Sequence, residues 1–208
     1  MSLLLQQIFS IPCYHCKKHL IATSIGLCED CSLDVPIAPR RYTGSSLLSE
    51  SWALAPYHGV MGTLIRRCKY RPDRTLLRHL ADRSADAAMD LPFFEAIVHV
   101  PVPWTRRMHR GFDQGELLAK SIAHRLQVPH LSVLGRIDKK EQAGLTMDAR
   151  RRKITERFYC KPATNIPSIV LLVDDVVTTG NTMESCAVEL YEYGARKIIG
   201  FSLASALL

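Results

Sequence analysis

The fold of this 208-residue chain is decided by the stretch Val170-Leu171-Leu172-Val173-Asp174-Asp175-Val176-Val177-Thr178-Thr179-Gly180-Asn181-Thr182. It consists of an apolar run, two adjacent acids, two further apolar residues and a turn rich in hydroxyl groups and glycine. The apolar run 169–173 is rich in β-branched residues, which is typical of a buried parallel strand. Open α/β sheets hold their ligands at the carboxyl ends of their strands, so the two acids are predicted to lie at a binding site.

The turn that follows the acids leads into a helical pattern. Its backbone N–H groups and the start of that helix are suited to holding a phosphate. A phosphorylated pentose matches both halves of the stretch, because carboxylates accept hydrogen bonds from ribose hydroxyls while the turn takes the 5′-phosphate. The alternative is an ordinary buried strand with a capped turn, in which the two acids need some other partner for their charges.

Strand patterns alternate with helical patterns along most of the chain. Such alternation predicts an α/β fold, with a parallel sheet flanked by helices on both faces. The predicted strands are 51–57, 96–100, 133–137, 169–173 and 197–203, and the predicted helices are 60–69, 74–89, 114–126 and 181–193.

Four of the seven cysteines form two closely spaced pairs, Cys13-x-x-Cys16 and Cys28-x-x-Cys31. Two such pairs can close a tetrahedral thiolate site, and four thiolates with no open position favour structural zinc. His15 and His19 are competing ligands, and two redox pairs or four unrelated thiols are the alternatives. The sequence therefore predicts a small N-terminal four-cysteine, zinc-ribbon-like module over residues 1–40, ahead of a main domain over 41–208.

Two further segments carry residues suited to binding anions. After strand 96–100, Arg110 can form two parallel bonds to a phosphate, and Gly111 lets the backbone approach the ligand. Asp113, with Glu116 three residues later, fits a helix capping box. The basic loop 139–153 contains Arg150 and either closes over a charged sugar phosphate or is a solvated run of charge.

The stretch 170–182 resembles the ribose-phosphate signature of type I phosphoribosyltransferases, whose donor is phosphoribosyl pyrophosphate (PRPP). With the other motifs in this order, the chain resembles the ComF/GntX family of amidophosphoribosyltransferase-like proteins. Two positions depart from that family, which usually has Asn where this chain has Asp113 and Lys153. The motifs that carry the resemblance are the paired cysteines, Lys69-Tyr70, Val100-Pro101-Val102-Pro103, Arg110-Gly111-Phe112-Asp113-Gln114, Gln142-x-x-Leu145 and the acid-pair signature.

The resemblance implies a type I phosphoribosyltransferase-like fold with an N-terminal zinc module, and a link to natural competence and DNA uptake. It implies that Asp174 and Asp175 bind the ribose hydroxyls with Mg²⁺ nearby, and that Arg150 and Lys153 act with them in catalysis. The remaining PRPP-binding residues that it implies are Val176, Val177, Thr178, Thr179, Gly180, Asn181, Thr182, Arg110 and Gly111.

No residue identifies the group that would attack the sugar, so whether the chain is an enzyme stays open. It is expected either to transfer a phosphoribosyl group, to sense PRPP without turnover, or to bind single-stranded DNA as a competence accessory protein. The net charge of +7 and the pI of about 9.1 fit polyanionic ligands such as PRPP or DNA, and DNA-uptake proteins are further expected partners. No apolar run is long enough to span a membrane, and the N-terminus lacks the features of a signal peptide, so we expect a cytoplasmic protein.

Overall fold

A mixed sheet forms the centre of the molecule. The computed structural model describes residues 11–23, 25–36, 38–70, 73–137, 158–161 and 165–208. Within these residues the sheet has six strands in the order β1-β2-β8-β7-β3-β4. Their bounds are β1 Arg40–Tyr42, β2 Glu50–Pro56, β8 Lys197–Ser205, β7 Ile169–Val177, β3 Ala96–His99 and β4 His130–Leu131.

Neighbouring strands from β2 to β4 run parallel, and β1 pairs with β2 in the antiparallel direction. A separate two-stranded antiparallel sheet joins β5 Leu134–Arg136 to β6 Phe158–Cys160. The predicted parallel sheet is therefore confirmed. The predicted strand 133–137, however, lies in the small sheet instead of the central one.

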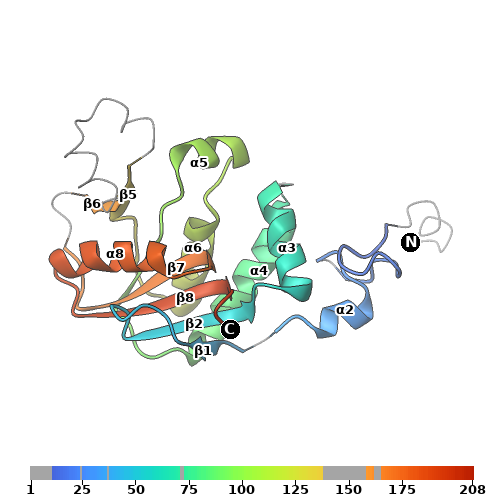
Figure 1. Ribbon diagram of the computed structural model, residues 1–208, viewed down its shortest axis with the longest axis horizontal. Coiled ribbons are helices and arrows are strands. Elements are labelled where there is room, and N and C mark those ends of the chain that lie inside the picture. Colours follow the sequence, from blue (N-terminus) through green and yellow to red (C-terminus); the bar gives the residue numbers. More distant parts are fainter. Residues whose placement is uncertain (1–10, 24, 37, 71–72, 138–157, 162–164) are drawn as a thin grey trace.

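Helices cover both faces of the sheet. The first face packs against α3 Gly59–Tyr70, α4 Arg74–Ala87 and α6 Gln114–Leu126, and the second packs against α8 Asn181–Glu192 (Figure 1). The side chains of β7 alternate between them, with Leu171 and Val173 in the first core and Val170 and Leu172 in the second. Because successive residues of a strand point to opposite faces, a strand covered on both sides needs the continuous apolar run seen in the sequence.

The chain leaves β3 and β7 in opposite directions. From β3 it passes through α6 to β4 at the edge of the sheet, and from β7 it passes through α8 to β8 on the other side. Since β3 and β7 are neighbours, this is the topological switch point of the sheet, where open α/β folds place their ligands. We call the ends of β3 and β7, with the loops that follow them, the carboxyl edge.

The four-cysteine segment lies at one end of the molecule, beyond α3 (Figure 1). It folds through tight turns, including Gly26 with a φ of +79°, and ends in the short helix α2 Glu29–Leu33. Cys13, Leu27 and Cys28 are buried in the same core as α3 and α4. The segment therefore packs on the main domain, while the domain boundary near residue 40 stays a prediction.

The remaining differences from the sequence-based expectation are local. Strand β7 continues to Val177, so both acids lie within the strand, whereas they were expected just after it. The segment after β3, expected to be a loop, contains the helix α5 Trp104–Arg110, and helix 74–89 ends in a 3₁₀ turn, η1 Ala88–Asp90.

Candidate phosphoribosyl site and four-cysteine centre

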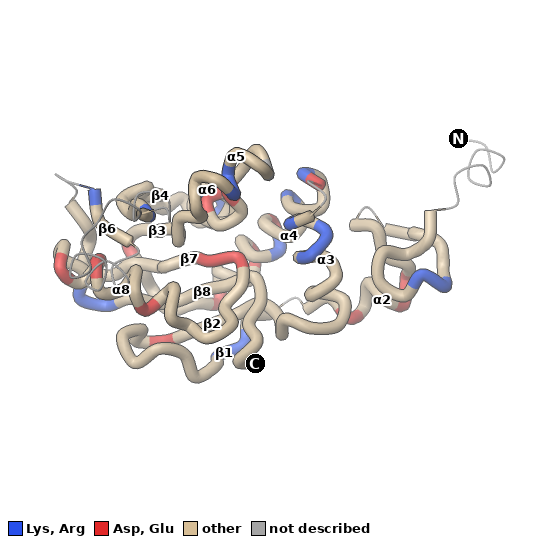
Figure 2. Tube along the Cα trace, turned by 45° about the horizontal axis from the view of Figure 1, so that its top comes forward, with Lys and Arg blue, Asp and Glu red and all other residues tan. Residues whose placement is uncertain are grey.

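The acid pair lies near the carboxyl end of β7. One Asp175 carboxylate oxygen is 3.0 Å from the Lys69 ammonium nitrogen, in the last turn of α3. The two side chains are 14% and 19% exposed, so most of this ion pair is shielded from water. Figure 2 shows the acidic stretch of β7 and the basic last turns of α3. The fold therefore supplies a cation to one of the two acids before any ligand binds.

Asp174 is more strongly perturbed than its neighbour. One of its carboxylate oxygens accepts a hydrogen bond of 2.7 Å from the backbone N–H of Asp175. Burial, followed by the charge of Asp175, raises the pKa of Asp174 well above its ordinary value, while Lys69 acts to lower it. Such a carboxyl group takes up or releases a proton in response to nearby charge, which is a property found at functional sites.

The turn after β7 has the backbone expected of a phosphate-binding loop. Gly180 has a φ of +84° and occupies the position that precedes α8, where it has no side chain with which to cap the helix. The first N–H groups of α8 are therefore not occupied by a side-chain cap, and they point toward the carboxyl edge. Thr178, Thr179, Asn181 and Thr182 are exposed around this turn.

The segment after β3 reaches the same edge. Its helix α5 ends at Arg110 and is followed by Gly111, which has a φ of +76°, and α6 begins after Asp113. The buried Asp113 carboxylate accepts 3.1 Å hydrogen bonds from the N–H groups of Glu116 and Val102. The predicted helix cap is confirmed, and the same side chain also ties the two ends of the loop together. Burial is the main cause that raises the pKa of Asp113.

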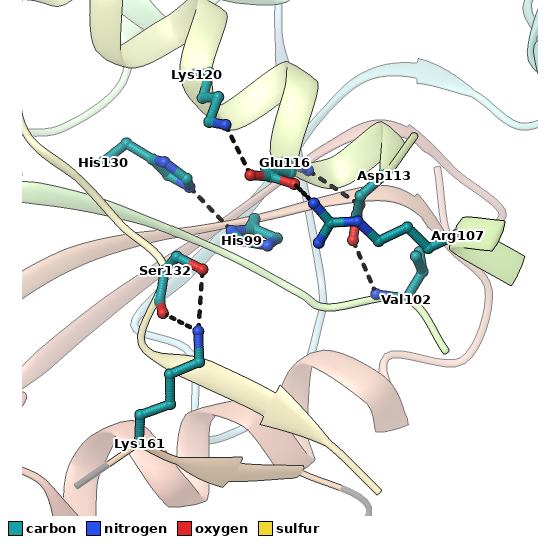
Figure 3. Close-up of polar contacts among 9 residues, drawn as sticks. All are labelled: His99, Val102, Arg107, Asp113, Glu116, Lys120, His130, Ser132 and Lys161. Atoms are coloured by element: carbon teal, nitrogen blue, oxygen red, sulfur yellow. Dashed lines mark hydrogen bonds and ion pairs between the residues drawn. The ribbon is translucent and has the colours of Figure 1, made fainter. Parts of the chain in front are cut away.

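A charged network surrounds the start of α6 (Figure 3). Glu116 contacts Arg107 at 3.2 Å and Lys120 at 2.7 Å, and its hydrogen bond to Lys120 is the main cause that lowers its pKa. Beneath it, the Nδ1 atom of His99 lies 2.9 Å from the Nε2 atom of His130. Burial, and then the nearby His130, lower the pKa of His99 to about 4, so this pair is neutral near neutral pH.

The four cysteines meet at the N-terminal end of the molecule. The ligand atoms of Cys13, Cys16, Cys28 and Cys31 all lie within 4.8 Å of one another, and the sulfur atoms of Cys16 and Cys28 are 3.8 Å apart. A zinc–sulfur bond of about 2.3 Å places neighbouring sulfurs of a tetrahedron about 3.8 Å apart. The arrangement therefore fits a tetrahedral zinc ion.

The surroundings shift the pKa values of the four thiols in different directions. Burial acts to raise the pKa of Cys13, but backbone N–H groups of Cys28, Cys16 and His15 outweigh it and lower this pKa to about 6. Burial and the neighbouring cysteines raise the pKa of Cys31 to about 12. Four thiolates cannot all form here without a cation that offsets their mutual repulsion, which is what a zinc ion supplies.

The two competing histidines point to other partners. The Nδ1 atom of His15 is 3.1 Å from the Thr63 hydroxyl oxygen on α3, and His19 pairs with Asp30 at 3.1 Å on the surface. His19, Cys28 and Asp30 also lie close enough together to be considered as ligands, but His19 and Asp30 are exposed. The four buried or half-buried cysteines are the better set, because they enclose the ion with soft ligands.

The chain is similar to a known protein family and to several known proteins. The family described as the phosphoribosyl transferase domain matches residues 113–206, which include the acid pair and its turn. Competence protein F of Haemophilus influenzae is 30% identical to this chain over 229 residues, covering 97% of this chain and 100% of that protein. The chain belongs to the competence protein F family.

Two other relatives match less of their own length. Competence protein ComFC of Streptococcus pneumoniae is 27% identical over 197 residues, covering 92% of this chain and 79% of that protein. The DNA utilization protein YhgH of Salmonella typhimurium is 32% identical over 138 residues, covering 64% of this chain and 59% of that protein. Membership of the competence protein F family fits the phosphoribosyltransferase-like fold, which the sheet and the domain match both support.

Most of the residues that are predicted for the phosphoribosyl site lie together at the carboxyl edge. The stretch 174–182 and Gly111 lie on the carboxyl edge, and Arg110 ends α5 beside them. Arg150 and Lys153 fall outside the described residues. A cavity of about 300 Å³ lies elsewhere, near His15, Arg40 and His58, and none of its lining residues belongs to the predicted site. We assign the site from the acid pair and the switch point, because that cavity contains neither.

Two features of this edge are not predicted from the sequence. Lys69 is predicted only as part of a family motif, although it supplies the partner of Asp175. The contact between His99 and His130, which lie on parallel neighbouring strands, is not predicted either. A lysine in the last turn of a helix and a histidine at a strand end are common, so no local signal marks either residue. Among the described residues, no helix is both long and apolar enough to span a membrane.

Proposed function

We propose that this member of the competence protein F family binds PRPP at the carboxyl edge and acts in DNA uptake during natural competence. The observation that carries the proposal is the acid pair on β7, followed by a glycine turn that opens α8 at the switch point. The names of its relatives, competence protein and DNA utilization protein, support the link to DNA uptake.

The roles of the residues follow from their chemistry. Asp174 and Asp175 would accept hydrogen bonds from the ribose hydroxyls, and Thr178–Thr182 would hold the 5′-phosphate with backbone N–H and hydroxyl groups. Arg110 and Gly111 would bind the pyrophosphate, and Arg150 and Lys153 would close over the ligand. Carboxylates beside a diphosphate are suitable surroundings for Mg²⁺, which would supply charge neutralisation of the pyrophosphate.

If the chain catalyses transfer, the bond between C1 of the sugar and the pyrophosphate oxygen breaks, and pyrophosphate leaves with the bonding electrons. An acceptor attacks C1 and loses a proton. The protein contributes by positioning the sugar and by keeping water from the electron-poor C1. PRPP binding without this step would instead make the chain a sensor.

We further propose that the four-cysteine centre holds structural zinc and that the protein acts in the cytoplasm. The sulfur geometry supports zinc. All seven cysteines are unpaired, which fits a reducing compartment. Zinc would fix the turns of the segment, which is too short to build a core of its own.

Calorimetric titration of the purified protein with PRPP and Mg²⁺ tests the binding proposal. We expect saturable heat for the wild type and at least a tenfold weaker affinity for Asp175→Asn, because a charged acceptor is worth about 1.5–3 kcal/mol. Circular dichroism and zinc content should be unchanged in that variant. Wild-type protein that is folded and zinc-loaded but gives no heat would sink the proposal.

Pyrophosphate release, measured with a panel of nucleobases and amines, separates the enzyme from the sensor. Release that depends on one acceptor supports transfer, and saturable PRPP binding without release supports sensing. Complementing a deletion strain with Asp175→Asn tests the link to competence, since uptake that recovers fully would show that the sugar site is not needed for it.

A further inference from the structure

The ion pair between Lys69 and Asp175 differs from the others in the described part of the chain. It is the pair in which both side chains are less than 20% exposed, whereas the next most buried, Arg67 with Asp73, has side chains that are 25% and 26% exposed. The pairs of Glu116 each include a basic side chain that is more than half exposed. The Lys69 pair is therefore the one least weakened by water and salt.

Stability alone is a poor reason for this pair. Charges removed from water lose hydration, and apolar replacements of a buried ion pair often leave a protein as stable or more stable. Here the lysine also acts on a second carboxyl group, because its charge lowers the pKa of the neighbouring Asp174, which the charge of Asp175 raises. A pair that served only stability would not need a second acid beside it.

The geometry leaves Asp175 able to bind a ligand. Lys69 approaches one oxygen of the carboxylate, and its ammonium nitrogen lies 5.9 Å from the centre of the Tyr57 ring. An ionised carboxylate offers about four acceptor positions on its two oxygens. A lysine that takes one of them fixes the orientation of the group and keeps its charge, while the others stay available to sugar hydroxyls.

Within the described part of the chain, the other titratable groups whose charges act on the acids do not provide a positive charge. Cys68 on α3, Tyr42 on β1 and Cys186 on α8 interact with the pair, and burial is the main cause that raises the pKa of each of them. These groups are therefore neutral near neutral pH. Among the described residues, Lys69 is a cation whose charge lowers the pKa of Asp174.

We propose that Lys69 is a positioning residue that holds Asp175 as an oriented acceptor, and so makes the site prefer ribose phosphates over 2-deoxyribose phosphates. The inference rests on the proposed ribose-phosphate site, and it identifies Lys69 as the residue that makes this site select ribose. A 2-deoxy sugar lacks one of the two hydroxyls, so it gains less from a fixed acceptor than ribose does.

The test compares the affinities for ribose 5-phosphate and 2-deoxyribose 5-phosphate, each with Mg²⁺, at pH 6.0 and pH 8.5. The variants are Lys69→Met and Lys69→Arg, with Arg125→Met as the control. Arg125 pairs with Asp86 on the surface at 2.9 Å, at the other end of α6 from the carboxyl edge. Circular dichroism and zinc content establish that each variant is folded. If Lys69→Met does not fold, Lys69→Gln takes its place.

We expect the wild type to prefer ribose 5-phosphate by about tenfold, the size of one hydrogen bond to a charged acceptor. In Lys69→Met the preference should shrink at pH 6.0, because the carboxylate loses the contact that orients it and the pKa of Asp174, already raised by burial, loses the cation that lowers it. The preference of this variant should be larger at pH 8.5 than at pH 6.0, because a higher pH favours the ionised form of a carboxyl group with a raised pKa. Lys69→Arg and Arg125→Met should keep the preference at both pH values.

A merely structural lysine would give a different pattern. If Lys69→Met weakens both sugars equally and leaves the preference and its pH dependence unchanged, the inference is wrong while the ribose-phosphate site stands. If the folded wild type binds neither sugar phosphate and no PRPP, the proposed function fails and the inference fails with it. If the wild type binds both sugar phosphates with equal affinity, the inference about ribose selectivity is wrong while the proposed binding site stands.

Discussion

The four-cysteine centre and the carboxyl edge both bring groups of like charge together, but they do so differently. The cysteines lie within one short segment, and their sulfurs meet through local turns. The acids on β7 meet a lysine from the opposite half of the chain. The thiols need a cation from solution before they can all ionise, whereas Asp175 already has one from α3. We infer that the first region is suited to holding a metal ion permanently and the second to exchanging its partners.

Helix α3 connects the two regions. On one side, its Thr63 contacts His15 at 3.1 Å and the Arg67 guanidinium lies 3.5 Å from the centre of the Tyr14 ring. On another side, its Lys69 holds Asp175. A change in the four-cysteine segment can therefore reach the acid pair through one rigid helix, so the independence of the two regions needs to be measured.

The largest effect is expected from breaking the cysteine centre. Cys28→Ser removes one of four thiolates, and structural zinc sites contribute about 10–16 kcal/mol of apparent binding free energy. We expect zinc content to fall from one ion per chain to near zero and residues 11–35 to become sensitive to protease. The main domain should stay folded, as reported by its tryptophans Trp52 and Trp104.

Cys160→Ala is the matched control, since Cys160 is a buried thiol on β6 away from the centre. It should keep the full zinc content. If Cys28→Ser changes the tryptophan fluorescence to that of the unfolded protein, the two regions form one cooperative unit and the comparison above fails.

Lowering the pH provides a second way to distinguish the two regions. The pKa of His99 falls to about 4 on folding, from about 6.5 in an unfolded chain, so the unfolded state binds the proton more readily between these values. Stability should therefore drop as the pH falls from about 6.5 to about 4, by about 3 kcal/mol for this one group. Asp113 and Asp174 have raised pKa values and act in the opposite direction.

The contribution of His99 is isolated by comparing the wild type with His99→Gln. Urea unfolding followed by tryptophan fluorescence at pH 4.5–7.5 should show a shallower loss of stability in the variant. His124→Gln, at an exposed position of α6, should keep the wild-type slope. Equal slopes for all three proteins would show that folding does not lower the pKa of His99. Zinc release, followed with a chromogenic chelator, reports the other region in the same samples.

The smallest effects are expected at two helix caps, one near each region. Asp73 caps α4 with a 3.0 Å bond to the N–H of Leu76, and Asp113 caps α6 and also binds Val102. Asp73→Ala should cost about 1 kcal/mol of unfolding free energy, and Asp113→Ala about 2 kcal/mol because it loses two bonds from a buried position. Thermal unfolding measures both.

The two variants should differ in ligand binding as well. Asp113→Ala frees the loop that is proposed to hold pyrophosphate, so its affinity for PRPP should fall. Asp73→Ala should leave that affinity unchanged, because Asp73 contacts Arg67 on the side of α3 that faces the four-cysteine segment. An equal loss of affinity in both variants would mean that the caps act only through overall stability.

The sequence by itself determined the features that depend on neighbouring residues. A β-branched run with hydrophobic side chains on both faces defined β7, and the Asp113 and Glu116 pattern marked the start of α6. The spacing of the cysteines was enough to predict that their sulfurs meet, because tight turns bring nearby residues together. These inferences succeed because backbone geometry over a few residues is governed by local sterics and hydrogen bonding.

Only the tertiary structure decided which distant residues complete the carboxyl edge. Lys69 reaches Asp175 because α3 packs on the sheet with its last turn close to the acids of β7, and His99 meets His130 because β4 adds to the sheet beside β3. The same packing extended β7 through both acids to Val177, by pairing it with β8 as far as Ser205. Strand order and helix placement depend on contacts summed over the whole core, which no short stretch of sequence contains.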